Sequence, residues 1–340
     1  MNSDTINDRL SSLPDSVLIT ILSLLPTNSA AATSVLSHSW RRLWTHITHF
    51  SFEPWKDWRY DYNFRDSMNT VNHILFQLTS SKLHTFHLNI PNPHSYTLFP
   101  DLETDTVLRD GLACLVPLIN LVCQRNPEVI TVFFQNSYPI QLHHLPPVQV
   151  VQTKSLVTLE LYANIELKFP DNLAVNLPNL KRLHMYLYDS QRHNLYIDMD
   201  KSSSLILNSK FVIDAPKLEQ FTVVGILAIN DFVTIPSNLE QVTLDLQKMD
   251  DNEVFLNERL VLFRGISCVR TLTIMGNCGV TLLDFLNKVD LPIYINLVHL
   301  IFDCVEQFHI NGRPQLPSSW LAKLKEIEVS IKMFNFLGSR

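Results

Sequence analysis

One pattern recurs along most of this 340-residue chain: an apolar residue is followed by a second three positions later and a third two positions after that. It occurs nine times, at Leu83/Phe86/Leu88, Val129/Val132/Phe134, Leu156/Leu159/Leu161, Leu180/Leu183/Met185, Leu218/Phe221/Val223, Leu239/Val242/Leu244, Val269/Leu272/Ile274, Leu297/Leu300/Phe302 and Leu324/Ile327/Val329. Successive starts lie 46, 27, 24, 38, 21, 30, 28 and 27 residues apart. Such self-similarity indicates a stack of repeating units.

Most of these spacings lie at or near the roughly 20 to 29 residues of a leucine-rich repeat. The last two residues of each triplet are two apart, so in a strand they point inward while their neighbours point outward. The sequence therefore predicts the α/β class, as an irregular leucine-rich-repeat solenoid with parallel strands on the concave face and helices or loops outside. The two long gaps indicate insertions, with a loop over 91–105, a helix over 107–123 and an extra strand within 189–210.

The outward positions of the nine predicted strands define the expected concave surface. Five of them are acidic (Glu160, Asp245, Asp303, Glu326 and Glu328) and one, Arg182, is basic. Such a surface is a poor match for a phosphate-rich ligand. Phe133, Tyr162, His184 and Tyr186 form a predicted aromatic patch, of residue types that are common at binding hot spots. Two interpretations stay open, because this patch either binds a substrate protein or only covers neighbouring repeats.

The segment from Leu10 to Trp44 has the pattern of three short helices. Pro14 with Asp15 favours a helix start, and Pro26 ends that helix. Its apolar residues have helical spacing, at Val17, Leu18, Ile21, Leu22 and Leu25.

The next two helices of this segment have predicted caps. We expect Thr27 to cap a second helix that runs to Leu36, and Ser37 to cap a third. The third carries its large apolar residues on one side, at Trp40, Leu43, Trp44 and Ile47. About 40 residues lie near the lower limit for an independent core, so the segment is expected to pack against a further surface.

Composition argues against several functional classes. A net charge of −6 and a pI near 6.1 argue against nucleic-acid binding, which calls for a basic stripe. The five cysteines are odd in number and lack CxxC spacing, so neither a disulfide framework nor a zinc site is indicated. The first ten residues are polar, which argues against a secretory signal, and the longest apolar run, 112–123, is too short to cross a bilayer. We therefore expect neither a nucleic-acid nor a membrane partner, and a location in the nucleus, the cytoplasm or both.

No arrangement of residues indicates catalysis. The histidine pairs, such as His143 with His144, lack a carboxylate or cysteine at a supporting metal spacing. Cys114, Cys123 and Cys268 lie in apolar runs, which favours inert burial. The chain has seven glycines and no phosphate-binding loop motif. We expect no metal, no cofactor and no catalytic residue, although an unrecognised enzyme site stays an alternative.

A set of fixed spacings runs through Asp8–Ser11, Leu13–Asp15, Ile21–Ser23, Leu25–Thr27 and Thr33–Ser37, and closes with Trp40, Leu43 and Trp44. These residues resemble the F-box of plant F-box proteins with leucine-rich repeats. The resemblance implies binding to a Skp-type adaptor and, through it, to the cullin and RING subunits of an SCF-type ubiquitin ligase. The residues implied for adaptor contact are Leu13, Pro14, Leu18, Ile21, Leu22, Leu25, Val35 and Trp40.

The segment departs from the F-box pattern at two positions. Asn28 and Ser39 stand where the family usually has lysine and arginine, which implies weaker charged contacts at the rim of the adaptor interface. The alternative interpretation is that these helices only cap the open end of the repeat array.

Later stretches resemble the same family. Phe211–Leu218 is similar to its repeat with an Asp-Ala-Pro corner, and Leu177–Leu183 to its Leu-Pro-x-Leu-Lys-x-Leu repeat. Pro317–Val329 resembles the start of the FBD region, with Trp320 in place of the usual cysteine. The expected organisation is an F-box over 8–50, a helical connector over 51–82, leucine-rich repeats over 83–316, and a final repeat with a truncated FBD-like start over 317–340.

The function expected from the sequence is substrate recognition. The F-box is expected to bind the adaptor while the repeats hold an unidentified target protein, with no chemistry performed by the chain itself. The alternative is a leucine-rich-repeat scaffold that binds partners but assembles no ligase.

Overall fold

The computed structural model describes residues 10, 12–53, 64–90, 115–134, 140–142, 153–163, 165–167, 173–187, 211–224, 229–245, 261–276, 294, 296–304 and 328–333. The chain divides into two units, Met1–Phe134 and Gln135–Arg340. Each unit has a mixed α/β structure with parallel strands. The predicted loop over 91–105 and the predicted extra strand within 189–210 lie outside the described residues.

The first unit begins with helices that follow prolines. α1 (Asp15–Leu22) follows Pro14 and α2 (Thr27–Ala32) follows Pro26, and both prolines have extended backbone with ψ of 145° and 137°. Each proline carbonyl accepts a hydrogen bond from the first turn, at 2.9 Å from Val17 N in α1 and 2.9 Å from Ala30 N in α2. The predicted start of the first helix is confirmed. Two 3₁₀ helices follow, η1 (Thr33–Val35) and η2 (Trp40–His46).

The capping predictions are met in part. Thr27 does not cap α2, because it is the first residue of that helix, and its Oγ1 instead accepts a hydrogen bond of 2.9 Å from Ser51 N. α2 ends at Ala32, earlier than predicted, and a 3₁₀ turn continues from it. Ser37 Oγ does accept a hydrogen bond from Trp40 N, at 3.4 Å, where η2 begins.

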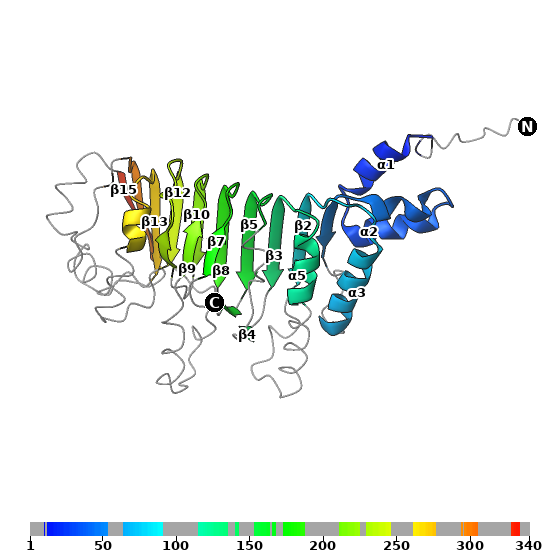
Figure 1. Cartoon of the computed structure of the whole chain (residues 1–340), viewed down its shortest axis with the longest axis horizontal. Coiled ribbons are helices and arrows are strands. Elements are labelled where there is room, and N and C mark those ends of the chain that lie inside the picture. The colour runs from blue at the N-terminus through cyan, green and yellow to red at the C-terminus, as the bar shows by residue number, and fades with distance from the viewer. Residues whose placement is uncertain are drawn as a thin grey trace, which may run out of the picture. The chain divides into compact units, whose positions relative to one another are not determined.

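Three parallel strands lie among the described residues of the first unit. They are β1 (His49–Phe52), β2 (Thr85–Ile90) and β3 (Val129–Phe134), with β2 pairing with both of the others. α3 (Phe64–Gln77) connects β1 to β2, and α5 (Leu115–Cys123) connects β2 to β3. Parallel neighbours require such crossover connections. Figure 1 shows α3 and α5 as labelled ribbons beside these strands.

β1 precedes the predicted repeats, which begin at Leu83, and its end falls inside the predicted helical connector. Ile47, Phe50 and Phe52 have the same spacing as the nine triplets, and all three are buried. Phe50 pairs with Phe86 of β2, and the two rings stack with centroids 5.2 Å apart. The strand pattern therefore starts directly after η2, and the triplet at Ile47 is the signal that sequence reasoning missed.

Seven of the described strands of the second unit lie at the positions of the remaining triplets and pair in parallel (Figure 1). In pairing order they are β5 (Thr158–Ala163), β8 (Arg182–Leu187), β10 (Gln220–Val224), β12 (Gln241–Asp245), β13 (Thr271–Gly276), β14 (His299–Cys304) and β15 (Glu328–Met333). One continuous register joins Leu159, Leu183, Phe221, Val242, Leu272, Leu300 and Val329.

A common turn leads into four of these strands. The amide of the first triplet residue donates to the carbonyl three residues earlier, at 3.0 to 3.1 Å, in Leu156, Leu180, Leu218 and Val269. All four of these side chains are fully buried. The first apolar residue of a triplet therefore anchors the turn in the core, while the next two residues face inward from the strand.

The register differs from the prediction at two strands. Thr85 pairs with Val129, and His299 pairs with Glu328, so the β3 and β15 triplets are each displaced by two residues from their predicted places. Because the displacement is even, the two faces of each strand are unchanged. The β15 positions opposite His299, Ile301 and Asp303 are consequently Glu328, Ser330 and Lys332.

Two smaller parallel sheets lie in the second unit and were not predicted. β7 (Leu173–Asn176), β9 (Phe211–Asp214) and β11 (Ile229–Phe232) form one, and β4 (Ile140–Leu142) pairs with β6 (Ile165–Leu167) in the other. The Asp-Ala-Pro corner begins at Asp214, the last residue of β9, and the carbonyl of Asp214 accepts a hydrogen bond of 3.0 Å from Leu177 N.

Candidate functional site

α1 is apolar on more than one face. Leu18 and Leu22 are buried, with 2% and 1% of their surface exposed, whereas Val17 and Ile21 are 41% and 36% exposed. A helix that buries one apolar stripe and leaves a second in water has a face suited to a partner. Figure 1 shows α1 near the N-terminal end of the described chain.

The exposed apolar residues concentrate in this region. Twelve large hydrophobic side chains are exposed in the described part of the chain, and eight of them fall between residues 10 and 36: Leu10, Leu13, Val17, Ile21, Leu24, Leu25, Val35 and Leu36. We call these eight residues the apolar face. Between Leu10 and Trp40 the sequence has one formally charged residue, Asp15. This concentration exceeds the scattered exposure that is normal on a soluble surface.

The residues beneath α1 form its support. Trp40, Leu43 and Trp44 of η2 are buried, as is Ile47. α1 contacts η2, and α2 contacts η1, η2 and β1. The predicted apolar side of the third helix is therefore confirmed, and it faces the interior.

The eight predicted adaptor-contact residues divide into two groups. Leu13, Pro14, Ile21, Leu25 and Val35 are exposed, whereas Leu18, Leu22 and Trp40 lie in the core. The three buried residues support the surface from below and are not placed to contact a partner directly. Leu10, Val17, Leu24 and Leu36 are also exposed but were not among the predicted adaptor contacts.

The predicted aromatic patch lies on both units. Phe133 is on β3, at the register position of Asn89, in the first unit. In the second unit, Tyr162 on β5 pairs with Tyr186 on β8, and their rings stack with centroids 4.6 Å apart and planes 9° apart. His184 pairs with Glu160 one row earlier. The structure thus brings Tyr162, Tyr186 and His184 together.

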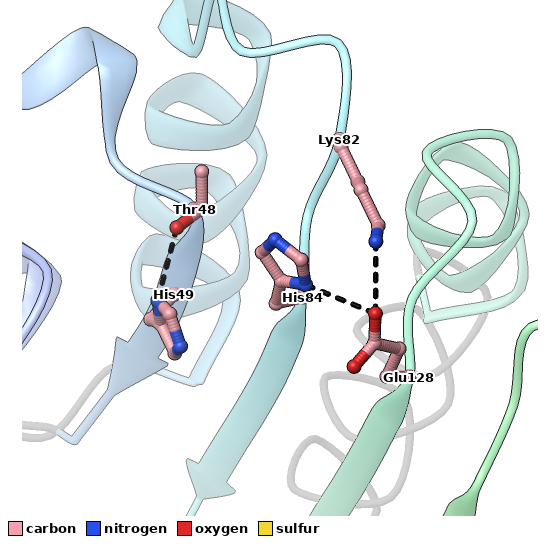
Figure 2. Close-up of polar contacts among 5 residues, drawn as sticks. All are labelled: Thr48, His49, Lys82, His84 and Glu128. Atoms are coloured by element: carbon pink, nitrogen blue, oxygen red, sulfur yellow. Dashed lines mark hydrogen bonds and ion pairs between the residues drawn. The ribbon is translucent and has the colours of Figure 1, made fainter.

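A polar cluster lies where the strands of the first unit begin (Figure 2). Glu128 Oε1 accepts a hydrogen bond of 2.8 Å from Lys82 Nζ and lies 3.1 Å from His84 Nδ1. His49 Nδ1 lies 3.0 Å from Thr48 Oγ1, and the rings of His49 and His84 stack with centroids 5.8 Å apart. Burial, then the neighbouring His84, lowers the pKa of His49. Hydrogen bonds from Lys82 and His84 lower the pKa of the Glu128 carboxyl.

This cluster has no metal-site geometry. Across the residues with described positions, no three His, Cys, Asp or Glu side chains are grouped so that they could hold a metal ion. The same residues contain no helix long and apolar enough to cross a membrane.

An open hollow of about 600 Å³ in the second unit is lined by residues that include Glu219, Glu240, Cys268, Arg270 and Asn296. The Cys268 thiol donates a hydrogen bond of 2.8 Å to the carbonyl of Pro236, and burial raises its pKa. A thiol that stays protonated is a weak nucleophile, so Cys268 is not activated for covalent catalysis.

Comparison with known proteins points to the apolar face. Residues 10–50 match the F-box domain model. An F-box/FBD/LRR-repeat protein of Arabidopsis thaliana is 28% identical to this chain over 346 residues, which cover 91% of this chain and 71% of that protein. A second protein so named from the same plant is 29% identical over 233 residues, covering 65% and 48%. An Arabidopsis F-box/LRR-repeat protein is 29% identical over 200 residues, covering 55% and 45%.

The chain spans about half to seven tenths of the length of the curated relatives that it matches. No solved structure matches it. The resemblance to plant F-box proteins, drawn from the spacing of residues 8–44, is confirmed.

Proposed function

We propose, from the F-box domain that residues 10–50 form, that this chain is the substrate-recognition subunit of an SCF-type E3 ubiquitin ligase. In this proposal the F-box binds a Skp-type adaptor, and the adaptor connects it to the cullin and RING subunits. One observation carries the proposal, namely that eight of the twelve exposed large hydrophobic side chains in the described residues lie between Leu10 and Leu36.

The apolar face has the composition of an interface core. Stable interfaces combine an apolar centre with a polar rim, and a few large side chains supply most of the binding free energy. Leu24, Val35 and Leu36 are 81%, 85% and 65% exposed, so a partner that covers them removes much apolar surface from water. Leu18, Leu22 and Trp40 hold this surface in place from the core.

We further propose that the parallel strands belong to an irregular leucine-rich-repeat solenoid, which holds the target protein. The continuous register from β5 to β15 supports this, as do the repeating turn and the buried first leucine of the triplets. The chain then contributes to the rate by proximity. It raises the effective concentration of target lysines near the ubiquitin-carrying enzyme without a catalytic residue of its own.

Co-purification with a Skp-type adaptor tests the proposal. The full chain is co-expressed with the adaptor and passed over a size-exclusion column, beside a Leu13→Ala/Pro14→Ala variant and a Val233→Ala control. Val233 is a large exposed side chain outside the F-box. We expect the wild-type chain and the control to co-elute with the adaptor and the F-box variant to lose most of it. A folded wild-type chain that elutes without adaptor contradicts the proposal and favours a scaffold that assembles no ligase.

A further inference from the structure

Four cationic side chains gather where three neighbouring strands of the second unit begin. They lie in or directly after the turns that lead into β5, β8 and β10, and all four are exposed: Lys154, Lys181, Arg182 and Lys217. We call these four residues the basic edge. Because the chain as a whole has a net charge of −6, this local excess of positive charge is opposite in sign to the rest of the molecule.

Hydrogen bonds hold the turns of the basic edge side by side. Asn179 joins two of them, because its Nδ2 donates a hydrogen bond of 2.8 Å to the carbonyl of Lys154 and its Oδ1 accepts one of 2.8 Å from Lys217 Nζ. The amide of Lys181 donates a hydrogen bond of 2.8 Å to the carbonyl of Val157, just before β5. The cations therefore belong to one continuous surface that spans three strands, with about 4.8 Å between neighbouring strands.

Most of this positive charge is not neutralised within the chain. Glu219 Oε1 accepts a hydrogen bond of 2.7 Å from Lys181 Nζ, and both side chains are partly exposed. Lys217 instead bonds to a neutral amide oxygen, and Arg182 Nε donates to the hydroxyl of Thr158 at 3.2 Å. Among the residues that the structure describes, three of the four cations therefore have no carboxylate partner.

The other described carboxylates nearby lie outside the basic edge. Glu160 is further along β5, and Glu240 precedes β12 in the next repeat. The carboxylate of Asp214 accepts a hydrogen bond of 3.3 Å from Thr234 Oγ1. The positive surface is thus confined to the starts of β5, β8 and β10.

A row of exposed cations suits a segment that carries carboxylates. Lysine and arginine form charge-assisted hydrogen bonds with carboxylates, and complementary charge selects one partner over another. Side chains on one face of an extended segment repeat about every 7 Å, so an acidic segment laid across the strand starts reaches cations of successive turns. A nucleic acid fits less well, because the net negative charge of the chain repels a long polyanion and four cations make no extended stripe.

We propose that the basic edge binds an acidic segment of the target protein, one rich in aspartate or glutamate. This inference rests on the proposed function, because it names the chemical class of target that the receptor recognises. Charge complementarity selects this occupant over a basic segment, which the four cations repel.

A labelled peptide tests the inference on the full chain. The probe is a fluorescein-labelled nonapeptide of alternating glutamate and glycine, compared by fluorescence anisotropy with arginine–glycine and serine–glycine peptides of the same length. The test variant is Lys154→Gln/Lys217→Gln, and Lys154→Arg/Lys217→Arg keeps both charges. The matched control, Lys82→Gln/Arg264→Gln, removes two exposed cations outside the basic edge. Circular dichroism melting establishes that each variant is folded.

We expect the glutamate peptide to bind more tightly than the other two, although the net charge of −6 by itself favours the arginine peptide. The double glutamine variant at the basic edge is expected to lose about five- to tenfold in affinity, while the double arginine variant and the control stay within about twofold of wild type. Glu219→Gln frees Lys181 from its ion pair and is expected to tighten binding about two- to fivefold.

Several results would overturn the inference. They are tighter binding of the arginine peptide, no measurable binding of the glutamate peptide, an equal loss in the control, and weaker binding in Glu219→Gln. A labelled single strand of nine thymidine nucleotides that binds more tightly than the glutamate peptide would also overturn it, because the partner would then be a nucleic acid.

Titration of the same samples with a Skp-type adaptor separates the two proposals. Adaptor binding without preference for the glutamate peptide overturns this inference alone. Peptide preference without adaptor binding overturns the receptor assignment, and with it the claim that the bound segment belongs to a ligase target.

Discussion

At the scale of single residues, Arg125 connects the chain before β3 to the end of α3 through three hydrogen bonds. Its guanidinium donates hydrogen bonds of 3.1, 3.1 and 3.3 Å to the carbonyls of Leu75, Leu78 and Ser80, where α3 ends. A cation at a helix C-terminus also meets the negative end of the helix dipole. Burial lowers the pKa of Arg125, yet arginine stays charged at neutral pH.

We predict that Arg125→Met lowers the free energy of unfolding by about 2 to 4 kcal/mol, because it leaves carbonyl groups without their charged donor. Chemical denaturation monitored by circular dichroism measures the change. Lys82→Met is the control, since its ion pair with Glu128 lies on the surface and is expected to contribute less than about 1 kcal/mol. Equal effects of the two substitutions would contradict the role given to Arg125.

The His49 cluster of Figure 2 predicts a pH dependence of stability. Burial and His84 lower the pKa of folded His49 from 6.5, so just below that pH the unfolded chain binds more protons. The contribution of His49 to the free energy of unfolding is therefore present above pH 6.5 and is lost as the pH is lowered toward the pKa of His49 in the folded chain. The lowered pKa of Glu128 acts in the same direction, but in a more acidic range, below the ordinary value of 4.5.

We therefore predict that the urea concentration at the unfolding midpoint decreases as the pH is lowered from about 7.5 to about 5.5. His49→Gln is expected to make this decrease smaller. A parallel titration of His73→Gln, a change at an exposed helix position, is the control. An unchanged pH dependence in His49→Gln would remove His49 as the source.

At the scale of elements, Gly265 allows the helical turn at 261–265 to pack closely against β11 of the three-stranded sheet. A Cβ on Gly265 meets Phe232 Cδ2 of β11 at 2.5 Å, and Phe232 packs edge-on against Phe221 of β10 with ring centroids 5.7 Å apart. All three residues are buried. A methyl group at residue 265 therefore forces the Phe232 ring out of its contact.

We predict that Gly265→Ala lowers the free energy of unfolding by about 1 to 3 kcal/mol through overpacking. A smaller side chain in the Phe232→Leu background relieves the clash, so the double variant is expected to lose less than the sum of the two single losses. Additive losses, measured by thermal melting of all four proteins, would show that Phe232 is not the group displaced.

The strands show what the sequence could predict. Triplets such as Leu180/Leu183/Met185 consist of one residue that anchors a turn and two residues that point inward from the strand. The triplet pattern therefore predicts where in the sequence each strand lies. Val129 and Leu324 were assigned as triplet starts because apolar residues two apart fill the last two positions of the pattern in either register, while the observed register places Pro127 and Glu326 at the first position. Backbone pairing with the neighbouring strand, which no single segment contains, decides between them.

The candidate site was predicted less completely than the strands. Ile21 and Leu22 are adjacent, similar in size and both compatible with the F-box pattern, yet only Leu22 is in the core. The choice depends on where η2 packs beneath α1, and this is a tertiary contact. Sequence spacing therefore identified the segment and most of its residues, but not the division between support and surface.

At the scale of the whole molecule, the proposed receptor separates its two tasks along the chain. The apolar face lies within residues 10–36, and the stacked Tyr162 and Tyr186 lie on strands of the second unit that begin at the basic edge. Substitutions in one are expected to leave binding at the other unchanged, because the two share no residues.

The pair Ile21 and Leu22 provides the most direct test of the central claim, that the exposed apolar face binds a Skp-type adaptor. The measurement is the dissociation constant of the purified chain for the adaptor, by calorimetric titration, with the melting temperature of each variant recorded beside it. We predict that Ile21→Ala weakens binding at least about tenfold with little change in melting temperature, while Leu22→Ala mainly lowers the melting temperature. Adaptor binding by Ile21→Ala as tight as by the wild-type chain, or no adaptor binding by the folded wild-type chain, would contradict the account.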